Sequence, residues 1–224
     1  PPLAAAFALV REATRRTLGM EQFDTQLIAA RIMLGNRLAE MATGEGKTLA
    51  AGIGAAAAAL AGVPVHLLTA NDYLVQRDRE KMLPLFEALG LSSACVLPSM
   101  ARAEREAAYR CDIVYLTARE LAFDYLRDHL LLSGVRDPRL LRALAISQGQ
   151  PGQQSTDFGA LCAMFETTTR ASLDVIAAPD AAPSTPFALQ GPAPVLPGLC
   201  LALIDEADSI LLDEATVPLI LAAA

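Results

Sequence analysis

Helical periodicity and short apolar runs alternate along this chain. The short runs, rich in leucine or β-branched residues, predict strands, and the longer stretches between them predict helices. The predicted helices span about 3–18, 24–35, 47–61, 72–89, 101–110 and 118–130. The predicted strands are 37–41, 63–70, 92–98, 111–117 and 198–204. This alternation is typical of an α/β domain in which helices flank a parallel sheet.

The alternation stops between residues 133 and 198. The stretch 147–157 reads SQGQPGQQSTD, and 177–198 contains six prolines. Regular structure is not expected there, because proline lacks the N–H group that helices and sheets use. Only 158–176 has the character of an isolated helix between two tethers. We therefore expect one domain built from 1–132 and 199–224, carrying 133–198 as a low-complexity, partly disordered insertion.

An uncharged stretch covers 49–65 and resembles a membrane span at first sight. It is rich in alanine, is interrupted by Pro64, and falls short of the ~20 strongly apolar residues that a spanning helix needs. A buried helix followed by a buried strand accounts for it better.

Composition excludes some classes of function. The net charge of −7 argues against a surface built for nucleic-acid phosphates, which requires clustered lysine and arginine. The four cysteines form no C-x-x-C pair, and with two histidines they give no zinc signature. We expect reduced, buried thiols.

The stretch AEMATGEGKTLAAG follows a predicted strand and begins a predicted helix, as a phosphate-binding P-loop does. Gly44 and Gly46 would let the backbone close around phosphate oxygens. Lys47 would reach the β- and γ-phosphates, and the Thr48 hydroxyl would bind Mg²⁺. The predicted phosphate-binding residues are Thr43, Gly44, Glu45, Gly46, Lys47 and Thr48.

A second motif supports this interpretation. In LCLALIDEADS an apolar strand ends in two carboxylates, at the sheet edge where open α/β folds bind ligands. Asp205 would hold Mg²⁺, and Glu206 would orient or deprotonate the attacking water. The alternative is an acidic helix start exposed to solvent. Both motifs follow predicted strands in the expected order, which predicts an ATP or GTP site with Lys47, Asp205 and Glu206 as catalytic residues.

The first glycine of the usual G-x-x-x-x-G-K-[ST] pattern is replaced by Met41. The loop instead fits the A-x-T-G-x-G-K-T form of helicase-like P-loop proteins. Several longer stretches go further and resemble SecA, the ATPase that drives preproteins through the bacterial Sec channel. They are FALVREATRRTLGMEQFDTQLIAA, AEMATGEGKTLAA, HLLTANDYLVQRD, RCDIVYLTARELAFDYLRD and ALIDEADSILLDEATVPLIL. The resemblance covers 7–130 and 199–221 and implies the first RecA-like motor lobe, a P-loop NTPase fold.

This resemblance assigns further roles. Gln26 would read the adenine edge, which makes the nucleotide ATP with Mg²⁺. A second group of residues would couple nucleotide state to the rest of the motor: Asn71, Asp72, Tyr73, Gln76, Arg77 and Asp78. From the residues alone, the same group is a capped helix start. The implied partners are the Sec channel, unfolded preproteins and anionic lipid, with a homodimer possible for the complete protein. The implied location is the cytoplasm, peripheral to the inner face of the cell membrane.

The chain also departs from the family pattern. Ala207 stands where the family usually has valine, so the motif reads DEAD, and Thr216 replaces an arginine. The 133–198 insertion is longer than the usual connection. In the family, the preprotein-binding domain and a second lobe with an arginine finger follow the point reached by Ala224. We therefore expect this chain alone to bind Mg·ATP weakly and to hydrolyse it very slowly.

Two alternatives remain at this stage. The literal DEAD favours an RNA helicase lobe, but TANDYLVQRD replaces the helicase PTRELA, and aromatic residues make up only 5% of the chain. The other alternative is a truncated, non-catalytic nucleotide-binding module.

Overall fold

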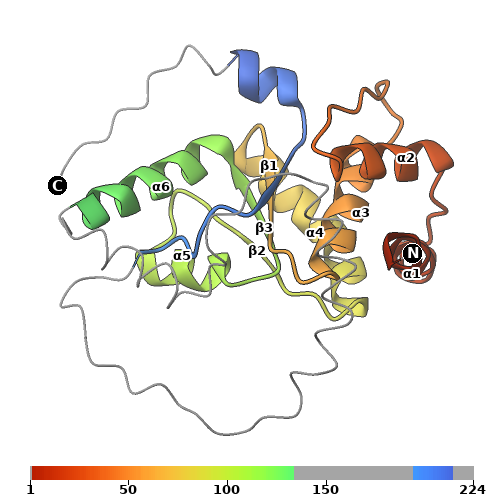
Figure 1. Ribbon diagram of the computed structural model, residues 1–224, viewed down its shortest axis with the longest axis horizontal. Coiled ribbons are helices and arrows are strands. Elements are labelled where there is room, and N and C mark those ends of the chain that lie inside the picture. The colour runs from red at the N-terminus through yellow and green to blue at the C-terminus, as the bar shows by residue number, and fades with distance from the viewer. Residues whose placement is uncertain (1, 134–193, 214–224) are drawn as a thin grey trace, which may run out of the picture.

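The computed structural model describes residues 2–133 and 194–213. Within these ranges, helices cover both faces of a four-stranded parallel sheet (Figure 1). The predicted helix at 158–176 and the substituted position Thr216 lie outside the described residues. The division of the chain into a motor lobe and an insertion therefore stays a prediction.

The sheet contains β1 (Val65–Thr69), β2 (Ser93–Cys95), β3 (Ile113–Thr117) and β4 (Leu201–Ile204). Their order across the sheet is β2-β3-β1-β4, and every pair is parallel. Val65 is in register with Ile113 on one side and with Leu201 on the other. Four of the five predicted strands are thus confirmed, and a strand from late in the chain lies beside the first.

All six predicted helices are confirmed, with ends that differ by a few residues. They are α1 (Pro2–Thr17), α2 (Asp24–Met33), α3 (Lys47–Ala59), α4 (Asp72–Ala88), α5 (Arg102–Tyr109) and α6 (Ala118–Ser133). A short π-helix, η2 (Ser209–Asp213), follows β4.

The alternation of side chains along each strand produces two cores. Leu67, Tyr115 and Leu203 point to the face covered by α3 and α4, and α1 and α2 pack outside these helices. Leu68 and Leu116 point to the other face, where α5 and α6 lie. Both faces of the central strands are buried, which explains their continuous apolar sequence.

The uncharged stretch 49–65 forms most of a buried helix and the start of a buried strand, as predicted. Every residue of α3 from Leu49 to Ala59 is buried. Among the described residues, no helix combines the length and apolar character needed to cross a membrane.

The described cysteines are free thiols, and all three are partly exposed rather than fully buried. Burial raises the pKa of both Cys95 and Cys200 to about 11. These two thiols are therefore protonated and weakly nucleophilic near neutral pH.

The predicted strand at 37–41 is wrong. This segment has no regular structure, and Leu38 is 82% exposed. A strand requires a neighbour for its backbone hydrogen bonds, and no strand of the described sheet pairs with this segment. The P-loop therefore follows an extended, irregular segment in the structure.

Candidate nucleotide-binding site

The P-loop is a tight turn that leads directly into α3. Gly44 and Gly46 have φ angles of +88° and +83°, which glycine adopts at little cost. The turn is closed by two hydrogen bonds between the same residues. The Glu45 N–H donates to the Ala42 carbonyl at 3.3 Å, and the Ala42 N–H donates to the Glu45 carboxylate at 3.1 Å. Because α3 begins at Lys47, the unpaired N–H groups of its first turn are available to an anion.

Gln26 contacts this loop from α2. Its side-chain amide donates to the Glu45 carbonyl at 2.9 Å, and its side-chain oxygen accepts from the Phe23 N–H at 3.2 Å. The contact is close, because a Cβ atom on Gly46 would lie 2.5 Å from Nε2 of Gln26. The structure thus brings the predicted adenine-reading residue to the loop. After these two hydrogen bonds, the Gln26 side chain still has one N–H donor and one acceptor lone pair unused.

The two halves of the predicted site meet at Thr48 and Asp205. Thr48 lies in the first turn of α3, and Asp205 directly follows β4. The Thr48 Oγ1 to Asp205 Oδ2 distance is 3.5 Å. Asp205 is held in place by its backbone N–H, which donates to the Leu68 carbonyl of β1 at 2.9 Å.

The environment of Asp205 is unfavourable to its own negative charge. Burial raises the pKa of this carboxyl group, and the nearby carboxylates of Glu206 and Asp78 raise it further. The Glu206 N–H and the Lys47 ammonium lower the same pKa, without overcoming the rise. A cation bound here would favour the ionised form of Asp205.

Glu206 has an unusual backbone conformation for a residue with a side chain. Its φ is +58°, in the left-handed region that non-glycine residues rarely occupy. The side chain is exposed next to Asp205, and the Glu206 carbonyl accepts from the Ile210 N–H at 3.2 Å. Backbone strain of this kind occurs often at functional sites.

The polar residues after β1 form the start of α4. Asn71 caps the helix, because its side chain accepts from the Leu74 N–H at 3.0 Å. Arg77 forms a 2.7 Å ion pair with Asp78, and its guanidinium lies 5.9 Å from the centre of the exposed Tyr73 ring. The capped helix start is thus confirmed, whereas the coupling role stays a prediction.

The remaining two residues of this group, Asp72 and Gln76, contact each other. The Gln76 side-chain amide donates to the Asp72 carbonyl at 3.4 Å, and Oδ1 of Asp72 is buried without a hydrogen-bond partner.

The burial of Asp78 close to Asp205 was not predicted from the sequence. Asp78 is 2% exposed and contributes to the raised pKa of Asp205. Its burial could have been inferred from its position on α4. Asp78 lies three residues after Val75 and four before Met82, both of which are fully buried, and this spacing places all three on one helical face.

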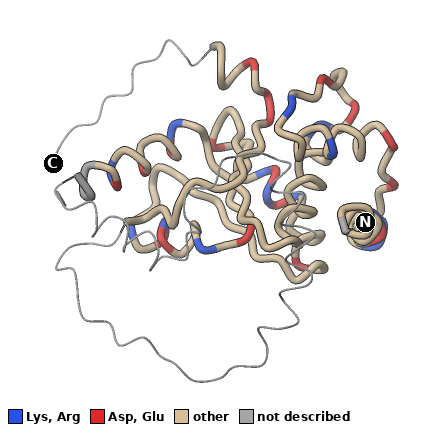
Figure 2. Tube along the Cα trace, viewed as in Figure 1, with Lys and Arg blue, Asp and Glu red and all other residues tan. Residues whose placement is uncertain are grey.

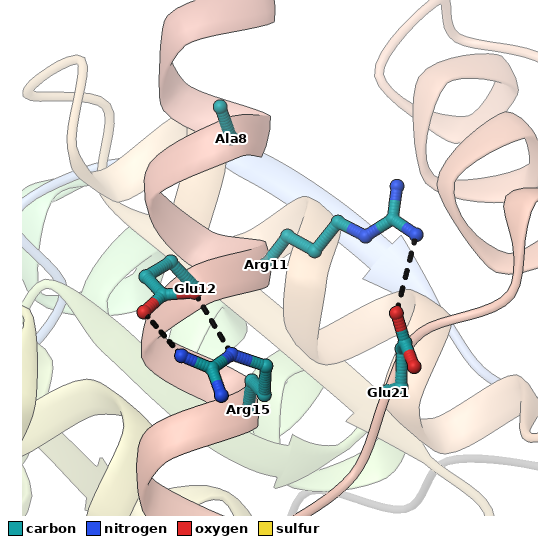
Figure 3. A pocket seen from close by; sticks show the side chains of 5 residues that line it. All are labelled: Ala8, Arg11, Glu12, Arg15 and Glu21. Atoms are coloured by element: carbon teal, nitrogen blue, oxygen red, sulfur yellow. Dashed lines mark hydrogen bonds and ion pairs between the residues drawn. The ribbon is translucent and has the colours of Figure 1, made fainter.

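A surface groove of about 360 Å³ lies elsewhere, between α1 and the segment leading to α2 (Figure 3). Its lining residues are Ala8, Arg11, Glu12, Arg15 and Glu21. The charges pair within the groove, because Arg15 lies 2.8 Å from Glu12 and Arg11 lies 3.9 Å from Glu21. It contains none of the predicted site residues.

No group of three or more histidine, cysteine, aspartate or glutamate side chains within 2–133 and 194–213 is placed to hold a metal ion. Thr48 and Asp205 instead offer two hard oxygen donors. This set fits Mg²⁺, which usually binds one or two protein oxygens together with substrate phosphates and water.

Comparison with known proteins identifies the family. The sequence pattern of the SecA DEAD-like domain matches residues 2–224. The chain belongs to the SecA DEAD-like domain family. Its parallel sheet between two helical layers is accordingly a RecA-like α/β fold, as predicted.

Similar proteins carry SecA names. The protein translocase subunit SecA 2 of Bordetella avium is 44% identical over 218 residues, which cover 97% of this chain and 27% of that protein. SecA 3 of Magnetococcus marinus is 40% identical over 218 residues, with the same coverage of 97% and 27%. SecA of Syntrophomonas wolfei is 50% identical over 131 residues, covering 58% of this chain and 16% of that protein. The chain spans about a quarter of the length of the first two relatives.

Proposed function

We propose that this SecA-family chain is the ATP-binding motor lobe of a translocase that couples ATP hydrolysis to preprotein export through the Sec channel. The observation that carries the proposal is the 3.5 Å approach of Thr48 to Asp205, which joins the P-loop to the acidic motif. The names of the similar proteins, protein translocase subunits, support the transport role.

Each site residue has a distinct task in this proposal. The turn at Gly44 and Gly46 and the first turn of α3 bind the phosphates, and Lys47 neutralises their outer oxygens. Thr48 and Asp205 would hold Mg²⁺, which when bound would stabilise negative charge on the phosphates. The exposed carboxylate of Glu206 orients the attacking water and accepts its proton.

Gln26 makes the site specific for adenine in this proposal. Its contact with the Glu45 carbonyl places its amide at the edge of the loop. The amide has one donor and one acceptor position left, a pair that matches the N6 donor and N7 acceptor of adenine.

The residues at the start of α4 transmit the state of the nucleotide site to the rest of the motor in this proposal. Arg77 is the best placed of them. Its guanidinium donates to the Asp78 carboxylate at 2.8 Å, and this hydrogen bond, with a smaller contribution from the charge of Glu206, raises the pKa of Arg77.

Activity of the 224-residue chain by itself is expected to be low. Family resemblance assigns the arginine finger to a second motor lobe, and such an arginine contributes roughly 10³–10⁵ in rate. The Sec channel, preproteins, anionic lipid and a location at the inner face of the membrane belong to the same proposal and apply to the complete protein.

The helicase alternative receives no support from the family match or from the charge distribution. Acidic and basic residues are interspersed along the described chain (Figure 2). Phosphate backbones instead require clustered lysine and arginine.

Binding of a fluorescent ATP analogue in the presence of Mg²⁺ tests the site. Lys47→Ala removes the phosphate-binding ammonium and is expected to abolish binding. The matched control is Lys81→Ala, which removes an exposed lysine from α4 and should leave affinity unchanged. Unchanged binding by Lys47→Ala would refute the site assignment. Rapid, saturable ATP hydrolysis by the isolated chain would contradict the expected dependence on a second lobe.

A further inference from the structure

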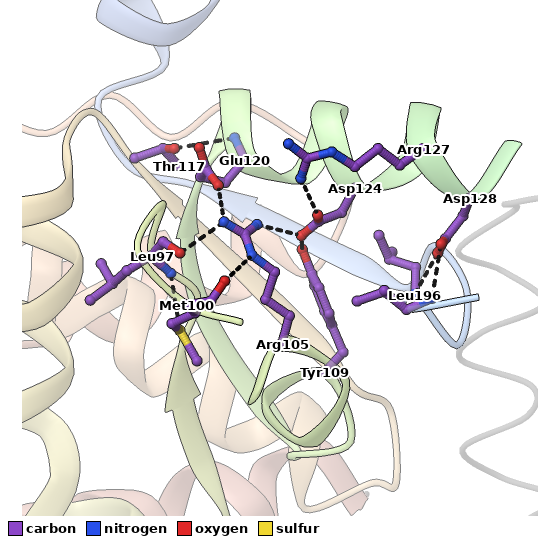
Figure 4. A network of polar contacts seen from close by, with 11 residues as sticks. Leu97, Met100, Arg105, Tyr109, Thr117, Glu120, Asp124, Arg127, Asp128 and Leu196 are labelled. Carbon is purple, nitrogen blue, oxygen red and sulfur yellow. Dashed lines mark hydrogen bonds and ion pairs between the residues drawn. The ribbon is translucent and has the colours of Figure 1, made fainter. Parts of the chain in front are cut away.

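Three acidic residues lie buried along one face of α6. Glu120, Asp124 and Asp128 are 6%, 2% and 5% exposed, respectively. Their spacing of four residues aligns them on the helix, and all three face other elements in Figure 4. Carboxylates are rarely this buried unless they are paired, so each should have a structural partner. All three belong to RCDIVYLTARELAFDYLRD, one of the stretches that resemble SecA.

The first two carboxylates bind one buried arginine. Arg105 of α5 lies 2.6 Å from Glu120 and 2.8 Å from Asp124, and it also donates to the Leu97 carbonyl at 2.8 Å. The Tyr109 hydroxyl donates to Asp124 at 2.9 Å. These contacts attach α6 to α5 and to the loop that precedes α5, and they fix the position of α6 on this face of the sheet.

Asp128 binds a different kind of partner. Its two carboxylate oxygens accept hydrogen bonds from the backbone N–H groups of Val195, at 2.9 Å, and Leu196, at 2.7 Å. These residues lie 67 and 68 positions further along the chain. Asp128 thus holds the chain at the point where it re-enters the described fold.

This point leads directly to the acidic motif. Val195 and Leu196 are each 6% exposed and pack in the core on the α5 and α6 face. The chain then continues into β4, which has four residues and pairs only with β1 in the described sheet, and Asp205 directly follows this strand. A strand this short has few ladder bonds to fix its position, so an anchor immediately upstream matters.

We propose that Asp128 is a positioning residue for the metal site: by holding Val195 and Leu196, it sets how β4 enters the sheet and keeps Asp205 within reach of Thr48. This inference rests on the proposed binding of Mg²⁺ by Thr48 and Asp205. Asp128 does not touch the nucleotide or the metal. It acts through the chain segment that delivers Asp205.

The test is Asp128→Asn in the 224-residue chain. An asparagine of the same shape keeps one acceptor oxygen but presents an NH₂ group to the second backbone N–H. ATP affinity is measured in EDTA and again in excess Mg²⁺. Affinity in EDTA should change by less than about twofold, whereas the enhancement by Mg²⁺ should fall about tenfold, the smaller effect typical of supporting residues around a metal.

Asp112→Asn is the matched control. Asp112 also accepts from a backbone N–H, that of Ser92 at 2.7 Å, but Ser92 leads into β2 rather than β4, and Asp112 precedes β3, at the opposite end of the parallel strands from Asp205. This variant should keep the full Mg²⁺ enhancement. Urea unfolding of both variants separates stability from binding. A loss of stability in Asp128→Asn with an unchanged Mg²⁺ enhancement overturns the proposal.

A second pair of variants completes the design. Should Asp128→Asn not fold, Asp128→Glu keeps both acceptors but displaces them, and it must lower the Mg²⁺ enhancement; an unchanged enhancement overturns the proposal equally. Asp205→Asn should remove the enhancement altogether. If it does not, the proposed metal site and the role of Asp128 both fail. If Asp205→Asn removes the enhancement while both Asp128 variants keep the full Mg²⁺ enhancement, only the positioning role of Asp128 fails.

Discussion

The hydroxyl oxygen of Thr48 lies 3.5 Å from a carboxylate oxygen of Asp205, although the two residues are 157 positions apart in the chain. The two residues belong to different parts of the fold: Thr48 lies in the first turn of α3, and Asp205 directly follows β4. The parallel pairing of β4 with β1 brings them together at one edge of the sheet. This pair of oxygens is the basis of the predicted Mg²⁺ site.

A double-mutant cycle on this pair should show strong coupling. Thr48→Ala removes an oxygen donor, and Asp205→Asn replaces a charged carboxylate with a neutral amide. Each should weaken Mg²⁺-dependent ATP binding by roughly 10–100-fold. The double variant should be little worse than either single variant, because both act on the same ion. Thr48→Ser keeps the hydroxyl and serves as the control. Titrations with Mg²⁺ at fixed ATP provide the measurement, and simple additivity would argue against a shared ion.

Gly46→Ala should weaken ATP binding beyond its effect on stability. The φ of +83° strains any residue with a Cβ, and this Cβ would also collide with Nε2 of Gln26. Gly62→Ala is the control, since its φ is +77° and no atom lies within 4 Å of the added Cβ. Both variants should lose about 1 kcal/mol of unfolding free energy. Only Gly46→Ala should reduce ATP affinity, by roughly tenfold, and equal affinities would show that Gln26 is not disturbed.

Two glycines of α3 should respond in opposite directions to the same substitution. A Cβ on Gly52 would overlap the side chain of Met82, which is fully buried, so Gly52→Ala should cost about 1–3 kcal/mol through overpacking. A Cβ on Gly54 would make an ordinary 3.5 Å contact with Leu203. Gly54→Ala should be neutral or stabilise by up to about 1 kcal/mol through helix propensity. Urea unfolding of both variants decides whether α3 and α4 pack as described.

Arg105→Ala should be strongly destabilising. It leaves Glu120 and Asp124 buried without their main cation, and breaking a buried ion pair in this way costs about 3–5 kcal/mol. Arg15→Ala is the comparison, because its ion pair with Glu12 is exposed and such pairs contribute little. Chemical denaturation provides the measurement. Similar losses in the two variants would mean that the Arg105 network is not the buried support described above.

His66 should make the protein less stable in mild acid. Burial lowers the pKa of this imidazole to about 4, whereas a histidine in the unfolded chain titrates near 6.5. The unfolded state therefore binds a proton first as pH falls, and stability is lost between about pH 6.5 and pH 4. His66→Gln should flatten this part of the stability profile, measured by urea unfolding at pH 7.5 and 5. An unchanged slope in the variant would assign the pH dependence to other groups.

The local pattern of apolar and polar residues was sufficient to predict most of the secondary structure. Strands β1 and β3 are mostly apolar because both of their faces are covered, and α4 begins at Asp72 because the side chain of Asn71 caps it. The strand predicted at 37–41 does not form, because secondary structure also depends on tertiary contacts. Its residues were compatible with a strand, but strand formation depends on a neighbour, and a neighbour is a property of the sheet rather than of the segment.

The chemistry of the site could be predicted from short motifs, but not the arrangement of its supports. The glycines at 44 and 46 and the carboxylates Asp205 and Glu206 were identifiable, because positive φ angles and charges at strand ends have strong residue preferences. The burial of Asp78 and the contact of Asp128 with Val195 and Leu196 were not. A lone acidic residue on a helix is usually exposed, and nothing local indicates which distant backbone it will meet.

The sequence by itself therefore determined the class of fold and the family, and it predicted the nucleotide-binding residues, because these depend on periodicity and on residues adjacent in the chain. Tertiary structure alone decided that Thr48 meets Asp205, that Gln26 reaches the Glu45 carbonyl, and that α6 holds the segment before β4. The physical reason is the distance along the chain over which each kind of interaction acts. Backbone propensity and capping act over a few residues, whereas burial and pairing depend on which distant segments the sheet places side by side.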